Sequence, residues 1–278
     1  MSPTISLYQI DSFTTDIFAG NPAAVCPCED WLADEVMQKL AAENNLAETA
    51  FAVPDKTGVA DFGLRWFTPT TEVELCGHAT LATAWVLFNE IGVNKPELSF
   101  TTQSGILTVT RGEGDLLVMD FPVNAPRPAP HHEFLPQALG GPAQQFWTAP
   151  NDMSLAVLGT ADAVCNLTPH MGAVAKLGKK GLIVTASGDE ADAVDFVSRY
   201  FPPKEGINED PVTGAAHTVL APYGARVLKK DDLHARQVSK RDGDVSCRMQ
   251  GVRVQLAGHA VLDMKGEESL TVVMQLVR

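Results

Sequence analysis

The stretch RWFTPTTEVELCGHATLATA, residues 65–84, contains the signals that decide the fold. An aromatic, strand-like segment ends at a proline, a polar loop follows, and Gly77 precedes a run of small and apolar residues typical of a helix. Cys76 and His78 flank this glycine, so two reactive side chains lie at the predicted start of the helix. The sequence therefore predicts a strand, a loop and a helix, with a candidate catalytic corner where the helix begins.

A second stretch, SRYFPPKEGINEDPVTGAAH at residues 198–217, repeats this order. In both stretches an Arg-aromatic-Phe segment is followed by proline, a loop and a glycine that begins an apolar run, Gly77 in the first and Gly214 in the second. The second loop is longer and the match is short, so chance similarity is an open alternative. A genuine repeat predicts two similar α+β domains whose helix N-termini can bind an anion, because their first N–H groups lack internal partners.

Composition limits the classes of partner. The chain has 278 residues, of which 45% are hydrophobic and 20% charged, which is typical of a folded globular protein. Its net charge of -13 would repel phosphate backbones and anionic lipids, which argues against nucleic acid and membrane as partners. A small anionic ligand would have to be bound by local donors such as helix N-termini.

Strand and helix signals alternate along the chain. We expect strands at residues 5–10, 21–26, 48–53 and 61–67, a helix at 31–44 capped by Asp30, and two alternating strands within 98–120. The proline-rich segment 121–132 suits neither helix nor central strand. We therefore expect a first domain over residues 1–124, a linker over 125–130 and a second domain over 131–278, with a last strand at 269–277 that returns to the first domain.

The five cysteines are odd in number and irregularly spaced, which argues against a disulfide framework. No apolar run reaches the roughly 18 residues of a membrane helix, and the N-terminus lacks a basic leader, so we expect a cytoplasmic protein. Cys26 and Cys28 resemble half of a metal site, but no second ligand cluster completes it. We also find no phosphate-binding glycine loop and no HExxH, so we expect neither metal nor cofactor.

Five segments together resemble the phenazine biosynthesis PhzF-like family: IDSFTTDIFAGNPAAV (10–25), LAAENNLAETAF (40–51), residues 65–84, FTTQSGILTV (100–109) and residues 198–217. This resemblance implies the diaminopimelate epimerase-like fold, which is α+β with two pseudo-symmetric domains, each a curled mixed or antiparallel sheet around a central helix. It also implies a cofactor-independent isomerase of a biosynthetic process, a small-molecule substrate bound between the domains, and a homodimer.

The resemblance also implies roles for single residues. The family's catalytic acid/base corresponds to Glu48, and its further catalytic groups correspond to His78 and Asp210. Asn21 corresponds to a substrate-binding asparagine. We further expect substrate contacts from the residues at the two helix starts, namely Cys76, Gly77, Thr213, Gly214 and Ala215. Ala215 departs from the family's usual serine, so it lacks a hydroxyl that would help bind a substrate carboxylate, and the substrate can differ from that of the phenazine enzyme.

Cys76 could instead indicate a different reaction. Related epimerases and racemases place one cysteine before the helix glycine in each half, and the two thiols exchange a proton on opposite faces of a carbon. The second half of this chain has Thr213 at that position, and a hydroxyl is too weakly acidic to be the partner base. Racemisation by two thiols is therefore disfavoured, and Cys76 is expected to be dispensable.

Glu48 is the better candidate for a proton carrier. Its surroundings in NLAETAF are small and apolar, so burial should raise its pKa toward working pH, although a solvated carboxylate is the ordinary alternative. His78 should be neutral because the positive end of a helix dipole disfavours imidazolium. Asp210 either pairs with His78 or only caps its own helix, Asn21 either binds ligand or shapes a turn, and His217 is expected to pack.

Two classes of function follow. The first is an isomerase in which Glu48 moves a proton between carbons of a small unsaturated or cyclic acid. The second is a non-catalytic binding protein on the same scaffold, and a Cys76-dependent racemase is a further alternative.

Overall fold

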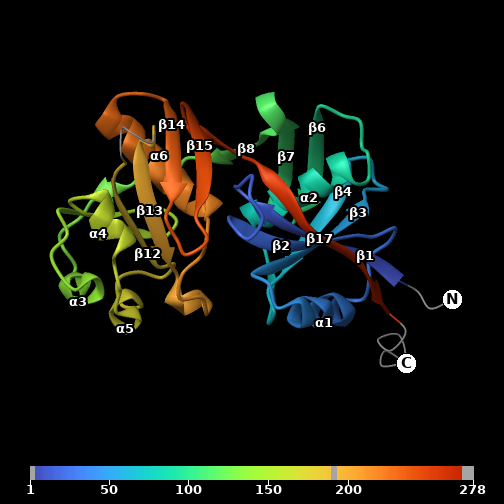
Figure 1. The fold of residues 1–278 in the computed structure, drawn as a ribbon, viewed down its shortest axis with the longest axis horizontal. Helices are drawn as coiled ribbons and strands as arrows, with labels where there is room; N and C mark the ends of the chain where they lie inside the picture. Colours follow the sequence, from blue (N-terminus) through green and yellow to red (C-terminus); the bar gives the residue numbers. More distant parts are fainter. Residues whose placement is uncertain (1–3, 189–192, 271–278) are drawn as a thin grey trace. The chain divides into compact units, whose positions relative to one another are not determined.

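The computed structural model describes residues 4–188 and 193–270 and forms two compact units (Figure 1). Unit 1 comprises Met1–Met119 together with Gly258–Arg278, and unit 2 comprises Asp120–Ala257. Each unit contains a mixed sheet and one long helix, so the predicted α+β class is confirmed. The predicted domain division around residues 125–130 stays a prediction. None of the helices within the described residues is long and apolar enough to cross a membrane.

Unit 1 is built from one curled sheet. Successive hydrogen-bonded neighbours are β17, β1, β2, β3, β4, β6, β7 and β8, with the short β5 paired to β4. The pairs β2–β3 and β4–β6 are parallel, and the other pairs are antiparallel. The bounds are β1 (Thr4–Ser12), β2 (Asn21–Pro27), β3 (Glu48–Pro54), β4 (Phe62–Phe67), β5 (Glu72–Val73), β6 (Glu97–Thr102), β7 (Gly105–Arg111), β8 (Leu117–Pro122) and β17 (Ala260–Ser269).

Helix α2 (Gly77–Asn89) lies inside the curl of this sheet (Figure 1). Ten of its thirteen residues are buried, and it contacts β1, β2, β3, β7 and β17. A helix that is apolar on nearly every side must be enclosed rather than laid on a surface. Its buried Thr80 and Thr83 hydroxyls donate to the carbonyls of Cys76 and Ala79, so they do not cost an unmade hydrogen bond.

Two shorter helical segments complete unit 1, namely α1 (Asp34–Asn44) and the 3-10 turn η1 (Glu113–Asp115). Helix α1 buries Val36, Met37 and Leu40. It begins later than the sequence predicted, with Ala33 rather than Asp30 at the N-cap, and Asp30 forms an exposed ion pair with Lys56.

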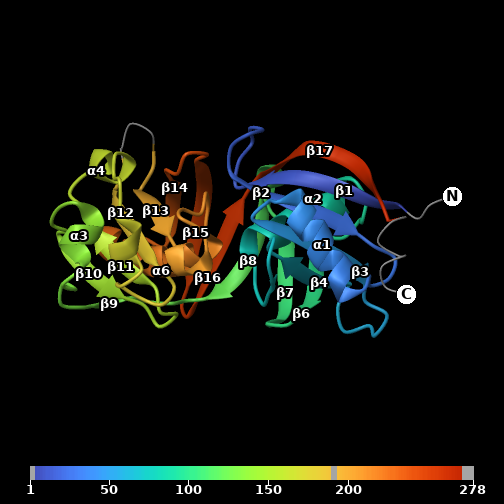
Figure 2. The same cartoon turned by 90° about the horizontal axis from the view of Figure 1, so that it is seen from below.

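Strand β17 comes from the far end of the sequence but pairs along the whole of β1, from Thr4 opposite Ser269 to Ser12 opposite Ala260 (Figure 2). One irregularity interrupts the register between Gln9 and Ile10. The strand predicted at 269–277 lies outside the described residues except for its first two positions. Unit 1 is therefore assembled from two segments separated by the whole of unit 2.

Unit 2 repeats the same arrangement. Strands β9 to β16 are neighbours in chain order, and the pairs β11–β12 and β13–β14 are parallel. The strands are β9 (Arg127–Pro128), β10 (Gln145–Thr148), β11 (Ser154–Val157), β12 (Leu182–Ser187), β13 (Phe196–Phe201), β14 (Asp232–Gln237), β15 (Gly243–Gln250) and β16 (Arg253–Gly258). The helical segments are α3 (Leu135–Leu139), α4 (Ala161–Cys165), α5 (Met171–Val174), η3 (Pro203–Glu205) and α6 (Gly214–Leu228).

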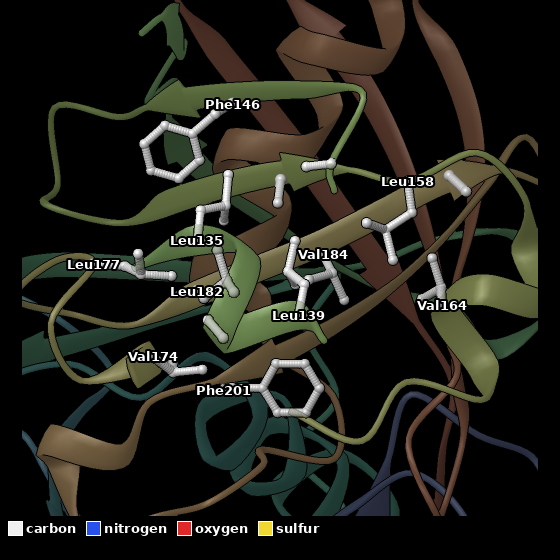
Figure 3. Packing of buried hydrophobic residues seen from close by; sticks show 14 of the residues in the cluster. Leu135, Leu139, Phe146, Leu158, Val164, Val174, Leu177, Leu182, Val184 and Phe201 are labelled. Atoms are coloured by element: carbon white, nitrogen blue, oxygen red, sulfur yellow. The ribbon is translucent and has the colours of Figure 1, made fainter. Parts of the chain in front are cut away.

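Two sides of the unit 2 sheet are filled differently. Helix α6 contacts β14 and β15. The short helices α3, α4 and α5 add to a separate apolar cluster in which Leu135, Leu139, Val184 and Phe201 pack together (Figure 3). The two units pair their strands in the same order of directions: β2–β3 and β11–β12 are parallel, β3–β4 and β12–β13 are antiparallel, and β4–β6 and β13–β14 are parallel. The repeat suggested by the sequence is thus present in the topology.

A pair of arginine–glutamate contacts, which we call the Arg–Glu clamps, strengthens this equivalence. Arg65 donates from Nε and Nη2 to Glu72 at 2.7 and 2.8 Å, and Arg199 donates from the same atoms to Glu209 at 2.6 and 2.9 Å. Each arginine also lies over the phenylalanine two residues later. Both glutamates lie in the segment between an arginine-bearing strand and a long helix, Glu72 in the two-residue β5 and Glu209 before α6, so each clamp ties that segment to the strand preceding it.

We expect Glu72→Gln to lower the free energy of unfolding by about 1–3 kcal/mol, because Arg65 then loses a charge-assisted, largely buried partner. Asp232→Asn is the matched control, since Asp232 pairs with Arg248 where both side chains are mostly exposed, and it should cost less than about 0.5 kcal/mol. Urea unfolding followed by tryptophan fluorescence measures both. Equal losses in the two variants would contradict a structural role for the clamp.

Candidate active site

Glu48 and His78 meet inside unit 1. Glu48 is the first residue of β3, and His78 is in the first turn of α2, which is held against that strand. The Glu48 Oε2 and His78 Nε2 atoms are 3.1 Å apart, and the side chains are only 14% and 8% exposed. Neither atom makes a hydrogen bond of standard geometry with a described residue. The contact is therefore a close ion pair between two largely buried side chains.

Cys76 adds a third group to this corner. It is the N-cap residue of α2, it is buried, and its Sγ lies 3.5 Å from His78 Nδ1. His78 thus has the thiol on the side of one ring nitrogen and the carboxylate on the side of the other. Glu48, from the start of β3, and Cys76 and His78, from the start of α2, thus form one buried cluster.

The ends of β1 and β2 fix the histidine. Ser12 and Asn21 face each other in the register of this strand pair, and both are buried. The Ser12 hydroxyl donates to the His78 carbonyl at 2.9 Å, and Asn21 Nδ2 lies 3.3 Å from His78 Nδ1. Gly20, at φ +63°, makes the turn into Asn21, and an added Cβ there would lie 2.2 Å from the Ser12 carbonyl oxygen. Asn21 therefore both ends this turn and orients the His78 ring.

The three groups shift one another's pKa values. Burial alone would raise the pKa of the Glu48 carboxyl, but the His78 imidazole and the Cys76 thiol lower it below 4.5. Burial alone would lower the pKa of His78, but Cys76 and Glu48 raise it well above 6.5. Burial, reinforced by the Glu48 charge, raises the pKa of the Cys76 thiol to about 11. At neutral pH these directions favour a Glu48 carboxylate and a neutral Cys76 thiol, so the charge that favours the imidazolium form of His78 is that of Glu48.

These directions correct two expectations from the sequence. Glu48 was expected to have a raised pKa and His78 to be neutral, because burial and the helix dipole were considered without the partner residue. A charge 3.1 Å away outweighs both effects. The His78 ring carries a proton on Nε2, facing Glu48, in either of two states. A neutral ring that accepts a hydrogen bond from Asn21 at Nδ1 has its single proton on Nε2, and an imidazolium has a proton on each ring nitrogen.

The remaining predicted residues lie in unit 2. Thr213 is the N-cap residue of α6, and its hydroxyl donates to Asp210 Oδ2 at 2.5 Å. The fully buried Gln237 accepts from the Thr213 N–H at 2.9 Å and donates to the Asp210 carbonyl at 2.7 Å. Asp210 therefore orders the start of α6 through Thr213, and its pairing with His78 stays a prediction.

Gly214 and Ala215 occupy the first turn of α6, in the positions that Gly77 and His78 occupy in α2. Ala215 is exposed, so a side chain larger than methyl would reach solvent there. His217 is fully buried, with Nδ1 2.8 Å from the Thr213 carbonyl, and burial lowers its pKa to about 4. This neutral, packed histidine agrees with the structural role expected from the sequence.

Two residues of these networks were not found from the sequence. Ser12 is an ordinary serine near a strand end, and Gln237 is the last residue of β14. Ser12 lies within the quoted segment 10–25, but nothing in its residue type assigned it a role, and Gln237 lies in no motif; each matters through the strand register that brings it to a helix start.

Known proteins resemble this chain over nearly its whole length. The family described as phenazine biosynthesis-like protein (PhzC-PhzF) matches residues 10–266. A protein of Pseudomonas aeruginosa named an uncharacterized isomerase is 47% identical and aligns over 94% of this chain and 98% of its own length. The crystal structure of a PhzF family protein from Enterococcus faecalis has a TM-score of 0.91 at 45% identity, covering 96% of this chain and all of that one.

A more distant neighbour bears on the fold alone. The hydroxyproline epimerase of Agrobacterium vitis superimposes with a TM-score of 0.60 at 13% identity, covering 98% of this chain and 94% of that one. The diaminopimelate epimerase-like and proline racemase-like architecture expected from the sequence is thereby confirmed.

In the wild type we expect His78 to keep its second ring proton above pH 6.5. In Glu48→Gln we expect the ring to lose this proton at a lower pH than in the wild type, because less negative charge then opposes the effect of burial on the ring. Side-chain ¹⁵N NMR as a function of pH measures this. The sign also fixes stability: the His78 contribution is full below pH 6.5, and that of Glu48 is full above pH 4.5. The melting temperature of the wild type should therefore exceed that of Glu48→Gln by the largest margin between pH 4.5 and pH 6.5. A His78 titration that is the same in both proteins would disprove the coupling.

Proposed function

The chain belongs to the phenazine biosynthesis-like (PhzC-PhzF) family and is an isomerase, and we propose that it moves a proton on a small unsaturated or cyclic acid without a cofactor. The single observation that supports this most is the buried 3.1 Å contact between Glu48 and His78. The Glu48 carboxyl is ionised at neutral pH and buried, so it can accept a proton, and the adjacent imidazolium is placed to stabilise negative charge that develops during the transfer.

The proposed reaction needs one base. The Glu48 carboxylate removes a proton from a substrate carbon, so a C–H bond breaks and an O–H bond forms while the electron pair shifts into the unsaturated system. The Glu48 carboxylic acid then returns the proton to another carbon. The His78 imidazolium stabilises negative charge during the transfer, and Asn21 orients the imidazole ring.

Other parts of the proposal rest on the family resemblance. Asp210, Thr213 and Gly214 belong to unit 2, and their contact with the same substrate as Glu48 stays a prediction. The negative net charge means that an acidic substrate depends on local donors, for which the N–H groups at the starts of α2 and α6 are suited. A homodimer and a cytoplasmic location are likewise predictions.

Two alternatives differ in what they require of the cluster. A Cys76-dependent racemase needs a thiolate, which the raised pKa of Cys76 disfavours at neutral pH. A non-catalytic binding protein needs no proton transfer.

We would first select, from small β,γ-unsaturated and cyclic carboxylic acids, a compound that shifts the His78 NMR signals, and then measure uptake of solvent deuterium into it. A bound compound that gains deuterium no faster than in buffer would support the binding protein instead.

Glu48→Gln should reduce deuterium uptake by roughly 10²- to 10⁴-fold, because it keeps the shape of the side chain but removes the group that accepts the proton. Binding of the compound, followed by the same NMR signals, should persist. Glu97→Gln is the matched control. Glu97 also begins a strand, but it is exposed, and its carboxylate accepts a hydrogen bond from Thr110, which is not part of the cluster. Full activity of Glu48→Gln would exclude this glutamate as the shuttle.

Cys76→Ser should retain deuterium uptake within about tenfold of wild type, because a thiol with a pKa of about 11 is not the base at neutral pH. The same assay at fixed pH measures it. A loss as large as that of Glu48→Gln would instead favour the racemase.

A further inference from the structure

The Glu48 cluster contains three different kinds of metal ligand. Three donor atoms lie within 4.8 Å of one another: a carboxylate oxygen of Glu48, the sulfur of Cys76 and a ring nitrogen of His78. Cys76 and His78 are only 7% and 6% exposed, so these donors come together away from bulk solvent. Glu48 Oε2 and His78 Nε2 face each other at 3.1 Å, so the carboxylate is already held against the ring that carries the second donor atom.

We propose that this cluster binds a thiophilic divalent cation of the Zn²⁺ type, with Glu48, Cys76 and His78 as the three protein ligands. Thiolate, imidazole and carboxylate are the usual ligands of zinc, and three of them leave one tetrahedral position for water. With Zn–S of about 2.3 Å and Zn–N of about 2.0 Å, the S–N edge of a tetrahedral site is about 3.5 Å. The observed Cys76 Sγ to His78 Nδ1 distance is 3.5 Å.

Binding needs one side-chain movement. In the structure the sulfur faces Nδ1 and the carboxylate faces Nε2, whereas a single ion uses one ring nitrogen. Glu48 has three rotatable side-chain bonds and is the most exposed of the three, so it is the ligand that can swing toward the ion. The Cys76 thiol gives its proton to solvent as the metal–sulfur bond forms, and the ligating ring nitrogen must likewise be free of a proton.

The consequence for activity rests on the proposed function. A carboxylate and an imidazole that are bound to a cation can neither accept a substrate proton nor stabilise the resulting charge. Occupation by the cation therefore switches proton transfer off, and its removal restores it. The cation acts in this chain as an inhibitor of the site and not as its cofactor.

Metal binding can be measured without any substrate. The full-length protein, freed of metal by EDTA and dialysed, would be titrated with Cd²⁺ and with Co²⁺ while the sulfur-to-metal charge-transfer absorption is recorded. We expect one ion per chain, loss of this band in both Cys76→Ser and Cys76→Ala, and affinity lowered at least tenfold in His78→Gln and Glu48→Gln. Cys165→Ser is the matched control because Cys165 is an exposed free thiol, and it should keep the band.

The outcomes separate the two proposals. A band that persists in Cys76→Ser, or that disappears only in Cys165→Ser, would overturn the metal site, as would its absence at stoichiometric metal in the folded wild type. Retained near-UV circular dichroism in each variant shows that a lost band is not lost folding. If the band behaves as expected but Glu48→Gln retains deuterium uptake, the metal site stands and the proton shuttle fails. If Zn²⁺ leaves wild-type uptake unchanged while the site is filled, the inhibition fails.

Discussion

Helix α2 is apolar on nearly every side, and its burial is the constraint on which the rest of unit 1 depends. A helix with one apolar stripe can rest on a flat sheet, but ten buried residues of thirteen require strands on several sides. The sheet meets this requirement by curling, with β1, β2, β3, β7 and β17 all in contact with the helix. Helix α6 imposes a weaker form of the same constraint on unit 2, where eight of fifteen residues are buried.

Enclosing the helix also determines the chemistry at its start. The N-terminal turn of α2 is brought against the first residue of β3, so a carboxylate, an imidazole and a thiol share a space that water barely enters. In such surroundings the interaction between charges dominates the desolvation of each, and the groups titrate as a set rather than singly. Unit 2 has the same scaffold but a different cluster, in which Asp210, Thr213 and Gln237 satisfy one another by hydrogen bonds.

Much of the fold was readable in the sequence because its signals are local. The glycines at 77 and 214 begin helices, Glu48 begins a strand, and the repeated Arg-aromatic-Phe segments end equivalent strands. The protonation of the cluster was not readable, because Glu48 and His78 meet only through the placement of β3 against α2. Strand β17 gives a weak signal for a related reason: none of its ten residues is buried, so no alternation of apolar and polar side chains marks it.

The position of β17 has a consequence for how the chain acquires its fold during synthesis. The ribosome releases β1 first and β17 last, with all of unit 2 between them. The nascent sheet of unit 1 therefore waits with one side of β1 unpaired, although its helix is already made, while unit 2 can complete its own pairing earlier. Unit 1 is first to be translated and last to close, because the second side of β1 is paired only by a segment made after the whole of unit 2.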